Sequence, residues 1–537
     1  MIGHFINVYL ISNVDYALRG RGTERPPLLF LLFINLFVDL LAMRYHAVMD
    51  VHVLVGPIKL QVSPRLPTED FNILKKHLSY VMHNYEYTAQ HKLHGWDGRK
   101  TLLYKNQMAP AGCLYRLVNL MKKHLGYTVT ITHKNNYKPE GEATVIPFDL
   151  EEFQQTAVMR AVKYRRGIIQ APVRAGKTAI ASAIINRIHH FPVWVVTNGK
   201  DLVIQTKLDL EEHLGMPVGV FTEGVFSPED IVVSSYQALG RAVSDAKKWK
   251  NTSIQSSKLV VRNKAVIKHL QSAKVVLFDE CHHALSPKNK GIANEALSAG
   301  YVLGLSGTPK PDKANRLELE AAIGSIIFRV KYETLIKHKR IARPKIVLYD
   351  LPYKWFAKGL REHAEIYNAN IVDNIYRNTF IAEIANKLKK AGKTIFIMIR
   401  KLDHGPILRS LISGSVFVHG GISGDDRKQL YKGIQDKRIK CIIGTVGKEG
   451  LNIPSLDAVI NAEGYKSSIA TTQKMRSLTA SAGKKYGIIV DFIDRGKFIA
   501  KHSKKRLKIY TAIKEAKMIK IKVSNEHFDM ESSRWSQ

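Results

Sequence analysis

Short apolar runs that alternate with helical stretches constrain the fold of this chain more than any other feature. They form two sets, at residues 167–170, 193–197, 231–234, 275–278 and 302–305, and again at 394–399, 415–418, 441–443, 458–461 and 487–490. Uninterrupted apolar runs between helices are typical of a parallel sheet that helices cover on both faces. The sequence therefore predicts two similar α/β units in tandem.

A phosphate-binding loop follows the first run of the first unit. Between that run and a helix-compatible stretch at 179–188 lie Ala171, Pro172, Val173, Arg174, Ala175, Gly176, Lys177 and Thr178. In such a loop, backbone N–H groups face the phosphates, the lysine reaches the β- and γ-oxygens, and the hydroxyl ligates Mg²⁺. The usual GxxxxGK[ST] pattern begins with glycine, where this chain has Ala171. The strand–loop–helix setting nevertheless predicts nucleotide binding.

An acidic pair, Asp279 and Glu280, follows the fourth run of the same unit. A strand-end aspartate can hold Mg²⁺ through water, and an adjacent glutamate can orient and deprotonate an attacking water. Such a pair is common by itself, but downstream of a phosphate loop it predicts phosphoryl transfer. The neighbouring Cys281, His282 and His283 do not predict zinc, because three adjacent residues on one turn cannot all face one tetrahedral ion.

In this order, the segments resemble those of the superfamily 2 helicases, in which two RecA-like domains clamp ATP. Phe153-Gln154 resembles the adenine-sensing glutamine, and Ser306-Gly307-Thr308 resembles the motif that couples hydrolysis to domain motion. The stretch 444–454, with Thr445 and Gly450, resembles the motif that touches both ATP and the nucleic-acid backbone. The resemblance implies ATP contacts by Gln154 and Gly450, coupling by His282, Ser306 and Thr308, and a DNA contact by Thr445.

The last helicase motif, usually QxxGRxxR, is incomplete. Its spacing to the run at 487–490 makes Arg476 the first arginine and places Thr472, Met475 and Thr479 at the Gln, Gly and second-Arg positions. These arginines stabilise charge at the γ-phosphate in the transition state. Either Arg476 is sufficient, or turnover is slow.

Residues 49–145 indicate a small α+β module, with an alternating strand after Met49, helices at 69–84 and 114–125, and a strand at 128–132. Residues 95–99 (GWDGR), 102–104 and 110–112 are similar to the N-terminal DNA-binding module of UvsW-type phage helicases, including those of T5-like phages, which act on branched DNA. That resemblance implies DNA contacts by Trp96 and Arg99. From the residues alone, Trp96 can equally be a core aromatic, with a hairpin turn at 97–98.

The expected organisation has five parts: an N-terminal extension at 1–48, the module at 49–145, RecA-like domains at 146–340 and 341–495, and a basic segment at 496–537. The apolar run at 28–43 is short for a bilayer span, so we favour a start at Met43 or Met49 over a membrane or export role. Residues 340–358 are a candidate hinge that also carries a strand-like stretch. The basic run after Asp494 indicates either a solvated helix face or phosphate contact.

The charge balance, 82 Lys plus Arg against 46 Asp plus Glu, gives a net charge of +36. Such an excess repels itself unless a polyanion offsets it, which favours nucleic acid over an acidic membrane surface as the partner. The widely spaced Cys113, Cys281 and Cys441 fit neither a disulfide framework nor a zinc pair. They indicate a reducing compartment, the cytoplasm, or the host cytoplasm if the chain is phage-encoded.

The predicted protein is an ATP-dependent DNA helicase or translocase that remodels branched DNA in phage replication, recombination or repair. Its expected cofactors are ATP and Mg²⁺, and its expected partners are DNA and other replication or recombination proteins. We expect no membrane association and no small-molecule substrate besides ATP. Three alternatives stay open: an RNA helicase with the same motor, the motor subunit of a restriction enzyme, and an ATP-gated DNA clamp with little turnover.

Overall fold

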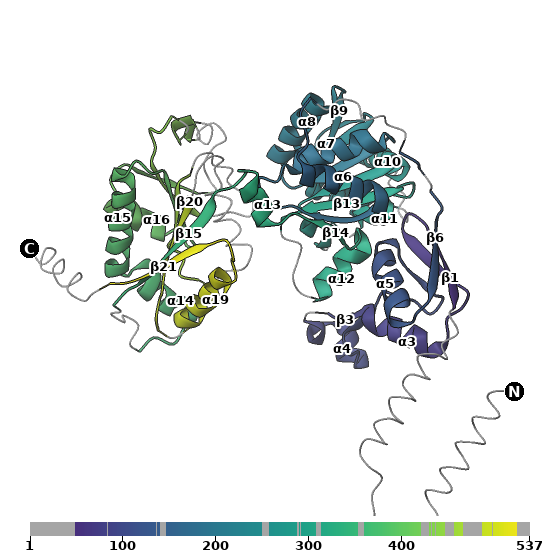
Figure 1. Ribbon diagram of the computed structural model, residues 1–537, viewed down its shortest axis with the longest axis horizontal. Helices are drawn as coiled ribbons and strands as arrows, with labels where there is room; N and C mark the ends of the chain where they lie inside the picture. The colour runs from purple at the N-terminus through teal and green to yellow at the C-terminus, as the bar shows by residue number, and fades with distance from the viewer. Residues whose placement is uncertain are drawn as a thin grey trace, which may run out of the picture.

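The structure is a computed structural model with a small N-terminal module and two α/β domains (Figure 1). It describes residues 49–82, 84–135, 137–139, 147–249, 257–286, 289, 291–307, 313–352, 359–419, 429–430, 432–434, 436–445, 456–465, 486–496 and 498–523. The apolar run at 28–43, and with it the N-terminal extension, lies outside these residues. Within the described ranges, every helix is too short or too polar to cross a membrane.

The N-terminal module is built on a four-stranded sheet of order β5-β2-β1-β6, in which β1 pairs antiparallel with β2 and parallel with β6. A separate two-stranded ribbon joins β3 to β4. The elements are β1 (Asp50–Val55), β2 (Lys59–Ser63), α3 (Thr68–His77), β3 (Ser79–Val81), η1 (Tyr85–Tyr87), α4 (Ala89–His94), β4 (Arg99–Thr101), β5 (Met108–Pro110), η2 (Ala111–Cys113), α5 (Leu114–His124) and β6 (Thr128–His133).

The helix predicted at 69–84 is shorter than expected. It ends at His77, because the next residues, Ser79 to Val81, pair with β4 instead of continuing the helical turn. A tyrosine followed by a β-branched valine suits a pleated ribbon better than a helix end. The prediction failed because the ribbon's partner strand lies about twenty residues downstream and leaves no local signal.

The first α/β domain contains an eight-stranded sheet of order β10-β9-β11-β8-β12-β13-β7-β14, parallel except for the β10–β9 edge pair. Its strands are β7 (Arg166–Gln170), β8 (Val193–Thr197), β9 (Val218–Phe221), β10 (Phe226–Ser227), β11 (Ile231–Ser235), β12 (Val275–Asp279), β13 (Tyr301–Ser306) and β14 (Ile326–Arg329). Its helices are α6 (Glu152–Tyr164), α7 (Lys177–Ile188), α8 (Lys200–Leu214), α9 (Tyr236–Trp249), α10 (Lys258–Ser272), η3 (Cys281–Leu285), α11 (Ile292–Glu295), α12 (Lys313–Ala322) and α13 (Tyr332–Lys337).

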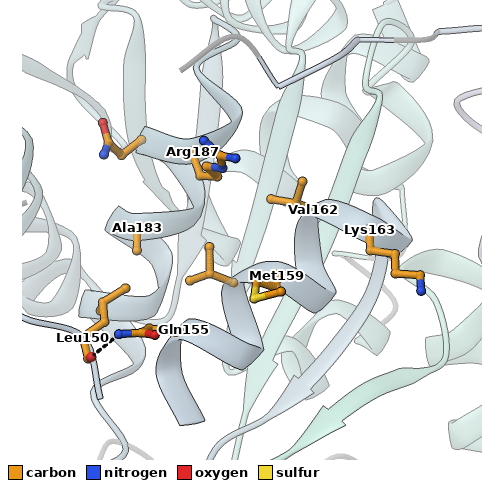
Figure 2. A pocket seen from close by; sticks show the side chains of 9 residues that line it. Leu150, Gln155, Met159, Val162, Lys163, Ala183 and Arg187 are labelled. Atoms are coloured by element: carbon orange, nitrogen blue, oxygen red, sulfur yellow. Dashed lines mark hydrogen bonds between the residues drawn. The ribbon is translucent and has the colours of Figure 1, made fainter. Parts of the chain in front are cut away.

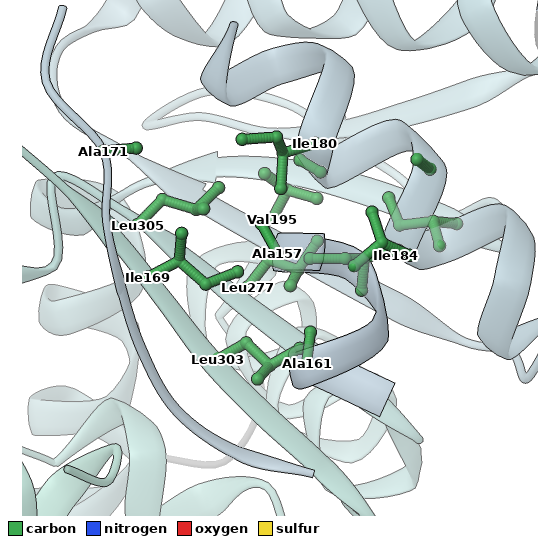
Figure 3. Close-up of a cluster of buried hydrophobic side chains, with 14 of the residues drawn as sticks. Ala157, Ala161, Ile169, Ala171, Ile180, Ile184, Val195, Leu277, Leu303 and Leu305 are labelled. Carbon is green, nitrogen blue, oxygen red and sulfur yellow. The ribbon is translucent and has the colours of Figure 1, made fainter. Parts of the chain in front are cut away.

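Helices α6 and α7 cover one face of this sheet and contact each other. A mainly apolar groove of about 400 Å³ runs between them, lined by Leu150, Met159, Val162 and Ala183 among others (Figure 2). Toward the sheet, the small Ala157 and Ala161 of α6 pack with Ile169, Leu277, Leu303 and other buried side chains (Figure 3). Small residues at this contact let α6 approach the strands closely, which fixes the helix beside the end of β7.

The second α/β domain contains a parallel seven-stranded sheet of order β17-β18-β16-β19-β20-β15-β21. When β10 is left aside, this order repeats that of the first sheet strand for strand, with β15 in the place of β7 and β21 in the place of β14. The elements are β15 (Arg343–Asp350), α14 (His363–Tyr367), η4 (Asn368–Val372), α15 (Ile375–Lys390), β16 (Ile395–Ile399), α16 (His404–Leu411), β17 (Ser415–Val418), β18 (Cys441–Thr445), β19 (Ala458–Asn461), β20 (Tyr486–Phe492), α19 (Ile499–Thr511) and β21 (Lys517–Lys522). The predicted α/β class with tandem parallel sheets is confirmed.

The second domain continues beyond residue 495, where we expected it to end. Strand β21 pairs with β15, and α19 buries Arg506 and Tyr510 beside the same sheet. The lysines of the predicted basic run lie on the exposed face of α19: Lys501, Lys504, Lys505 and Lys508. This segment therefore completes the second sheet, and its charge is carried by the outer face of a packed helix.

The candidate hinge at 340–358 contains β15, which lies inside the sheet between β20 and β21. Its alternating pattern of buried and half-buried residues differs from the continuous apolar runs of the other strands. That alternation is why the sequence showed only a strand-like stretch here. Residues 353–358 lie outside the described part of the chain.

Candidate active site

The predicted phosphate loop lies at the carboxyl end of β7, the edge of a parallel sheet where ligands bind in α/β folds. Gly176 immediately precedes α7 with φ +75°, and a Cβ at this position would lie 2.4 Å from Gln154 Nε2. Only glycine fits this left-handed, crowded position. Ala171 is fully buried in the core cluster, and its N–H donates to the Ser306 carbonyl over 3.0 Å. Its methyl group packs at the position where the usual pattern has glycine.

Gln154 links helix α6 to the phosphate loop. Its Oε1 accepts from the Glu151 N–H at 3.0 Å, and its Nε2 donates to the Ala175 carbonyl at 3.0 Å. The side chain is only 2% exposed. Gln154 therefore holds the loop in place, while the adenine contact implied by the family resemblance stays a prediction.

Lys177 and the acidic pair meet at this edge. Lys177 Nζ forms an ion pair with Glu280 Oε1 and lies 3.8 Å from Asp279 Oδ1. Asp279 Oδ1 is buried and, among the described residues, has no hydrogen-bond partner. A buried carboxylate oxygen without a hydrogen-bond donor fits a magnesium ligand. Thr178 follows Lys177 in α7 and is half-buried.

The two carboxylates differ in pKa. Burial raises the pKa of Asp279, and the neighbouring Lys177 only partly offsets this effect. Burial also acts on Glu280, but the ion pair with Lys177 and the hydrogen bond from Ser306 outweigh it and lower that pKa. The two acids in turn outweigh desolvation at Lys177 and raise the pKa of its ammonium group. Glu280 is therefore ionised at neutral pH, as a group that orients water must be.

Glu280 is also connected to the predicted coupling residues. Ser306 Oγ donates to Glu280 Oε2 at 3.2 Å, and His282 Nδ1 lies 3.1 Å from Ser306 Oγ and 3.4 Å from Glu280 Oε2. Glu280 has a φ of +43°, a left-handed conformation that is costly for a side chain with a Cβ. This turn directs Glu280 toward Lys177 and places His282 beside the end of β13. Thr308, the third predicted coupling residue, lies outside the described residues.

Two residues of the site had not been predicted. Tyr236 is fully buried and donates its hydroxyl to the Asp279 carbonyl at 3.0 Å, and Thr197 Oγ1 lies 3.5 Å from Asp279 Oδ2. Thr197 is the last residue of β8, and Tyr236 directly follows β11, so both lie at the carboxyl ends of strands. The rule that these ends meet at one edge could have found them.

The predicted DNA-binding residues of the module lie between α4 and β4. Trp96 is half-buried outside the module's core cluster, and its Nε1 donates to the Arg99 carbonyl at 3.3 Å. The Arg99 side chain is 54% exposed, 3.6 Å from Asp97. Residues 97–98 are not a hairpin turn, because helix α4 precedes them. The Trp96 side chain therefore stabilises this loop, and the Arg99 side chain is largely exposed to solvent.

The remaining candidates belong to the second domain. Thr445 ends β18 and is half-buried, on the carboxyl edge of the second sheet. Gly450 and Arg476 lie outside the described residues. The groove of Figure 2 contains none of the predicted site residues.

The chain is similar in sequence to several known proteins. Residues 147–311 match the family "Type III restriction enzyme, res subunit". The chain is 24% identical over 459 residues to the ATP-dependent DNA helicase uvsW of Enterobacteria phage T4, covering 79% of this chain and 87% of that protein. It is 29% identical over 199 residues to the DNA 3'-5' translocase XPB2 of Sulfurisphaera tokodaii, covering 37% and 39%.

Two solved structures match this chain. The ATP-dependent Type ISP restriction-modification enzyme LlaBIII bound to DNA has a TM-score of 0.50 at 16% identity, over 76% of this chain and 34% of that one. The crystal structure of T4 UvsW has a TM-score of 0.42 at 20% identity, over 88% and 99%.

The phosphate loop and the acidic pair on the first of two parallel sheets, together with these similarities, indicate an ATP-dependent helicase, and the chain resembles the helicases of superfamily 2. Within that class it resembles the UvsW-type phage helicases, and the predicted resemblance is confirmed.

Proposed function

We propose that this protein is an ATP-dependent DNA helicase or translocase that remodels branched DNA, such as replication forks and four-way junctions. The observation that carries the motor is the cluster of Lys177, Asp279, Glu280, Ser306 and His282 at one sheet edge. DNA as the substrate is supported by the similarity to a phage DNA helicase, which spans most of both chains.

The described residues suggest how the motor works. The phosphates of ATP compete with Glu280 for the Lys177 ammonium group, so that binding ATP releases the carboxylate. Glu280, freed and still ionised, then orients the attacking water and accepts its proton. Ser306 and His282 contact the same carboxylate and so respond to whether it is engaged.

Magnesium is part of this proposal. Thr178 and Asp279 would hold the ion, since the buried Asp279 Oδ1 has no hydrogen bond within the described part of the chain. When bound, Mg²⁺ neutralises charge on the β- and γ-phosphate oxygens. We further propose that Arg476 reaches the γ-phosphate from the second domain, and that Gln154 and Gly450 contact ATP.

The net charge of +36 supports binding mainly through DNA phosphates. Affinity should therefore fall steeply with salt and show little base specificity, with Trp96, Arg99 and Thr445 among the contacts. The three cysteines are buried and unpaired, which supports a reducing cytoplasm, that of the host if the chain is phage-encoded. Roles in phage replication, recombination or repair, with partner proteins of those processes, complete the proposal.

Phosphate release tests this function. It should be measured with no nucleic acid, single-stranded DNA, duplex DNA, a four-way junction and structured RNA, at low and moderate salt, together with strand separation of the junction. We expect the junction to stimulate release most and to be unwound only with ATP. Stronger stimulation by RNA would replace DNA as the substrate, and binding without turnover would replace the helicase by an ATP-gated clamp.

A further inference from the structure

Helix α12 lies between the N-terminal module and the first α/β domain (Figure 1). On its domain side, Leu319 and Ile323 pack in one buried cluster with Cys281 and Ala284 of η3. The 3-10 helix η3 carries His282, which contacts Ser306 and Glu280. One side of α12 is thus packed against the turn that follows Glu280 and carries its contact His282.

The other side of α12 is held by the module through specific polar contacts. Arg116 of α5 donates twice to Glu320, from Nε at 2.5 Å and from Nη2 at 2.8 Å. The Tyr80 hydroxyl of β3 donates to Glu318 Oε1 at 2.5 Å. Glu320 and Tyr80 are only 5% and 6% exposed, so solvent screens these contacts little.

The backbones also meet at this contact. A Cβ at Gly112 would lie 2.0 Å from the Glu320 carbonyl oxygen and 2.7 Å from that of Ala321. Ala321 itself packs against the apolar core of the module. Gly112 belongs to the segment 110–112 that marked the module in the sequence, and its lack of a side chain permits this close approach. The backbones of the module and α12 are therefore in direct contact, which leaves no space for one to move against the other at Gly112.

We propose that α12 relays the nucleotide state of the ATP site to the N-terminal module, with Arg116 and Tyr80 as the positioning residues. Release of Glu280 by bound nucleotide changes the contacts of Ser306 and His282, η3 shifts with His282, and α12 carries the shift to the module. The chain connection supports this path, because α12 is the first described helix after Ser306. A relay needs an element that both sites bias, and α12 contacts both the module and η3, the turn beside the ATP site. The effect of the relay on DNA remodelling rests on the proposed function, whereas the response of the module to nucleotide does not.

Hydrogen exchange of the full chain tests the relay without DNA. Uptake is compared with and without a non-hydrolysable ATP analogue and Mg²⁺, at residues 171–178 and at the module segments 78–81 and 111–117. In the unaltered chain, both regions should exchange more slowly with the analogue. In Tyr80→Phe and Arg116→Gln, the loop should still respond and the module should not. A control on the same helix, Lys123→Ala, changes an exposed lysine and should behave like the unaltered chain.

The relay is refuted if the analogue does not change hydrogen exchange in the module of the unaltered chain. It is also refuted if both variants show the same change in module exchange as the unaltered chain. Because Arg116→Gln leaves Glu320 buried without its partner, Tyr80→Phe, which removes only a hydroxyl, keeps the test valid should the first variant fold poorly.

Phosphate release with and without a four-way junction adds the functional consequence. In both variants, the ratio of junction-stimulated to basal phosphate release should fall about tenfold, the size of a typical coupling between sites. The basal rate of phosphate release and the affinity for the junction should stay within about twofold of those of the unaltered chain. An unchanged ratio would contradict the relay. Absence of stimulation in the unaltered chain would instead refute the proposed function, with the exchange result still standing.

Discussion

The two α/β domains share a strand order but place different chemistry on the same sheet edge. In the first domain, β12 ends in Asp279, beside Lys177 and Glu280. In the second, the corresponding strand β19 ends in Asn461, whose amide donates to Asp491 of β20 at 3.1 Å. Both edges thus carry charged and polar groups, and the strand order alone does not tell which edge is catalytic.

Burial and hydrogen bonding separate the two edges. Lys177 is 18% exposed and the acidic pair 27%, with one carboxylate oxygen left without a hydrogen bond. In the second domain, Arg506 and Asp491 are only 2% and 1% exposed, and Arg506 bonds both Asp491 and Asp494 at 2.9 Å. Tyr510 adds a hydrogen bond to Asp491 at 2.6 Å. Charges that are accessible and incompletely paired indicate a ligand site, whereas buried and fully paired ones hold a fold together.

The largest expected effect comes from Lys177→Ala. The phosphate loop loses the cation that it directs at the β- and γ-phosphates, so ATP hydrolysis should fall by at least about a thousandfold. Phosphate release and nucleotide binding measure the loss. The matched control is Lys163→Ala, an exposed lysine of α6, which should leave both unchanged. Normal ATP hydrolysis by Lys177→Ala would show that the ATP site does not lie at this edge of the first sheet.

Arg506→Met should instead damage stability. The substitution leaves Asp491 buried without its cation, while Asp494 keeps its ion pair with Arg377 at 2.9 Å. Breaking such a buried pair costs roughly 3–5 kcal/mol. Denaturant unfolding followed through the second domain measures the change. The neighbouring Lys505→Met alters an exposed lysine of the same helix and should cost little. Equal unfolding of the two variants would show that the second edge is not the structural one.

Ser306→Ala sharpens the contrast within the first edge. Removing the hydroxyl takes a hydrogen bond from Glu280 and its contact from His282, while the small buried side chain leaves packing intact. We expect nucleic-acid-stimulated hydrolysis to fall about tenfold with ATP affinity unchanged, the range of a typical coupling energy. A parallel loss of ATP affinity would make Ser306 a binding residue instead.

The smallest effect concerns pH. Because burial raises the pKa of Asp279, its proton is held more tightly in the folded chain, and stability is lost as pH rises from the ordinary aspartate value toward the folded one. Asp279→Asn should therefore raise the unfolding temperature without ligand, with a gain that shrinks as pH falls toward about 3.9. Asp149→Asn, an exposed control, should show no such gain. A gain that grows as pH falls would contradict the sign.

Local pattern predicted the elements whose burial is complete. The runs at 193–197 and 458–461 are fully buried strands with those same limits, because a strand covered on both faces is mainly apolar. Strand β21 is mostly exposed and rich in lysine, so its sequence, KMIKIK, was interpreted as part of a basic segment. Exposure at a sheet edge removes the apolar signal on which the prediction depends.

The site divides in the same way. Lys177, Asp279 and Glu280 were predicted because each has a local motif. Ser306 and His282 were expected as coupling residues only from the family resemblance, and their contacts with Glu280 were not predicted. The hydrogen bond from Gln154 to the Ala175 carbonyl and the ion pairs of Arg506 join separate segments of the chain. Such contacts depend on the folded arrangement of strand ends, which no local pattern encodes.

The central claim is that the carboxylate of the first edge acts on ATP while that of the second maintains the fold. Phosphate release and thermal unfolding of Glu280→Gln, compared with Asp491→Asn, test it most directly. Glu280→Gln should unfold like the unaltered chain and bind ATP, yet release phosphate at least about a hundredfold more slowly. Asp491→Asn should be destabilised but keep its turnover per folded molecule. Undiminished phosphate release by Glu280→Gln would contradict the claim.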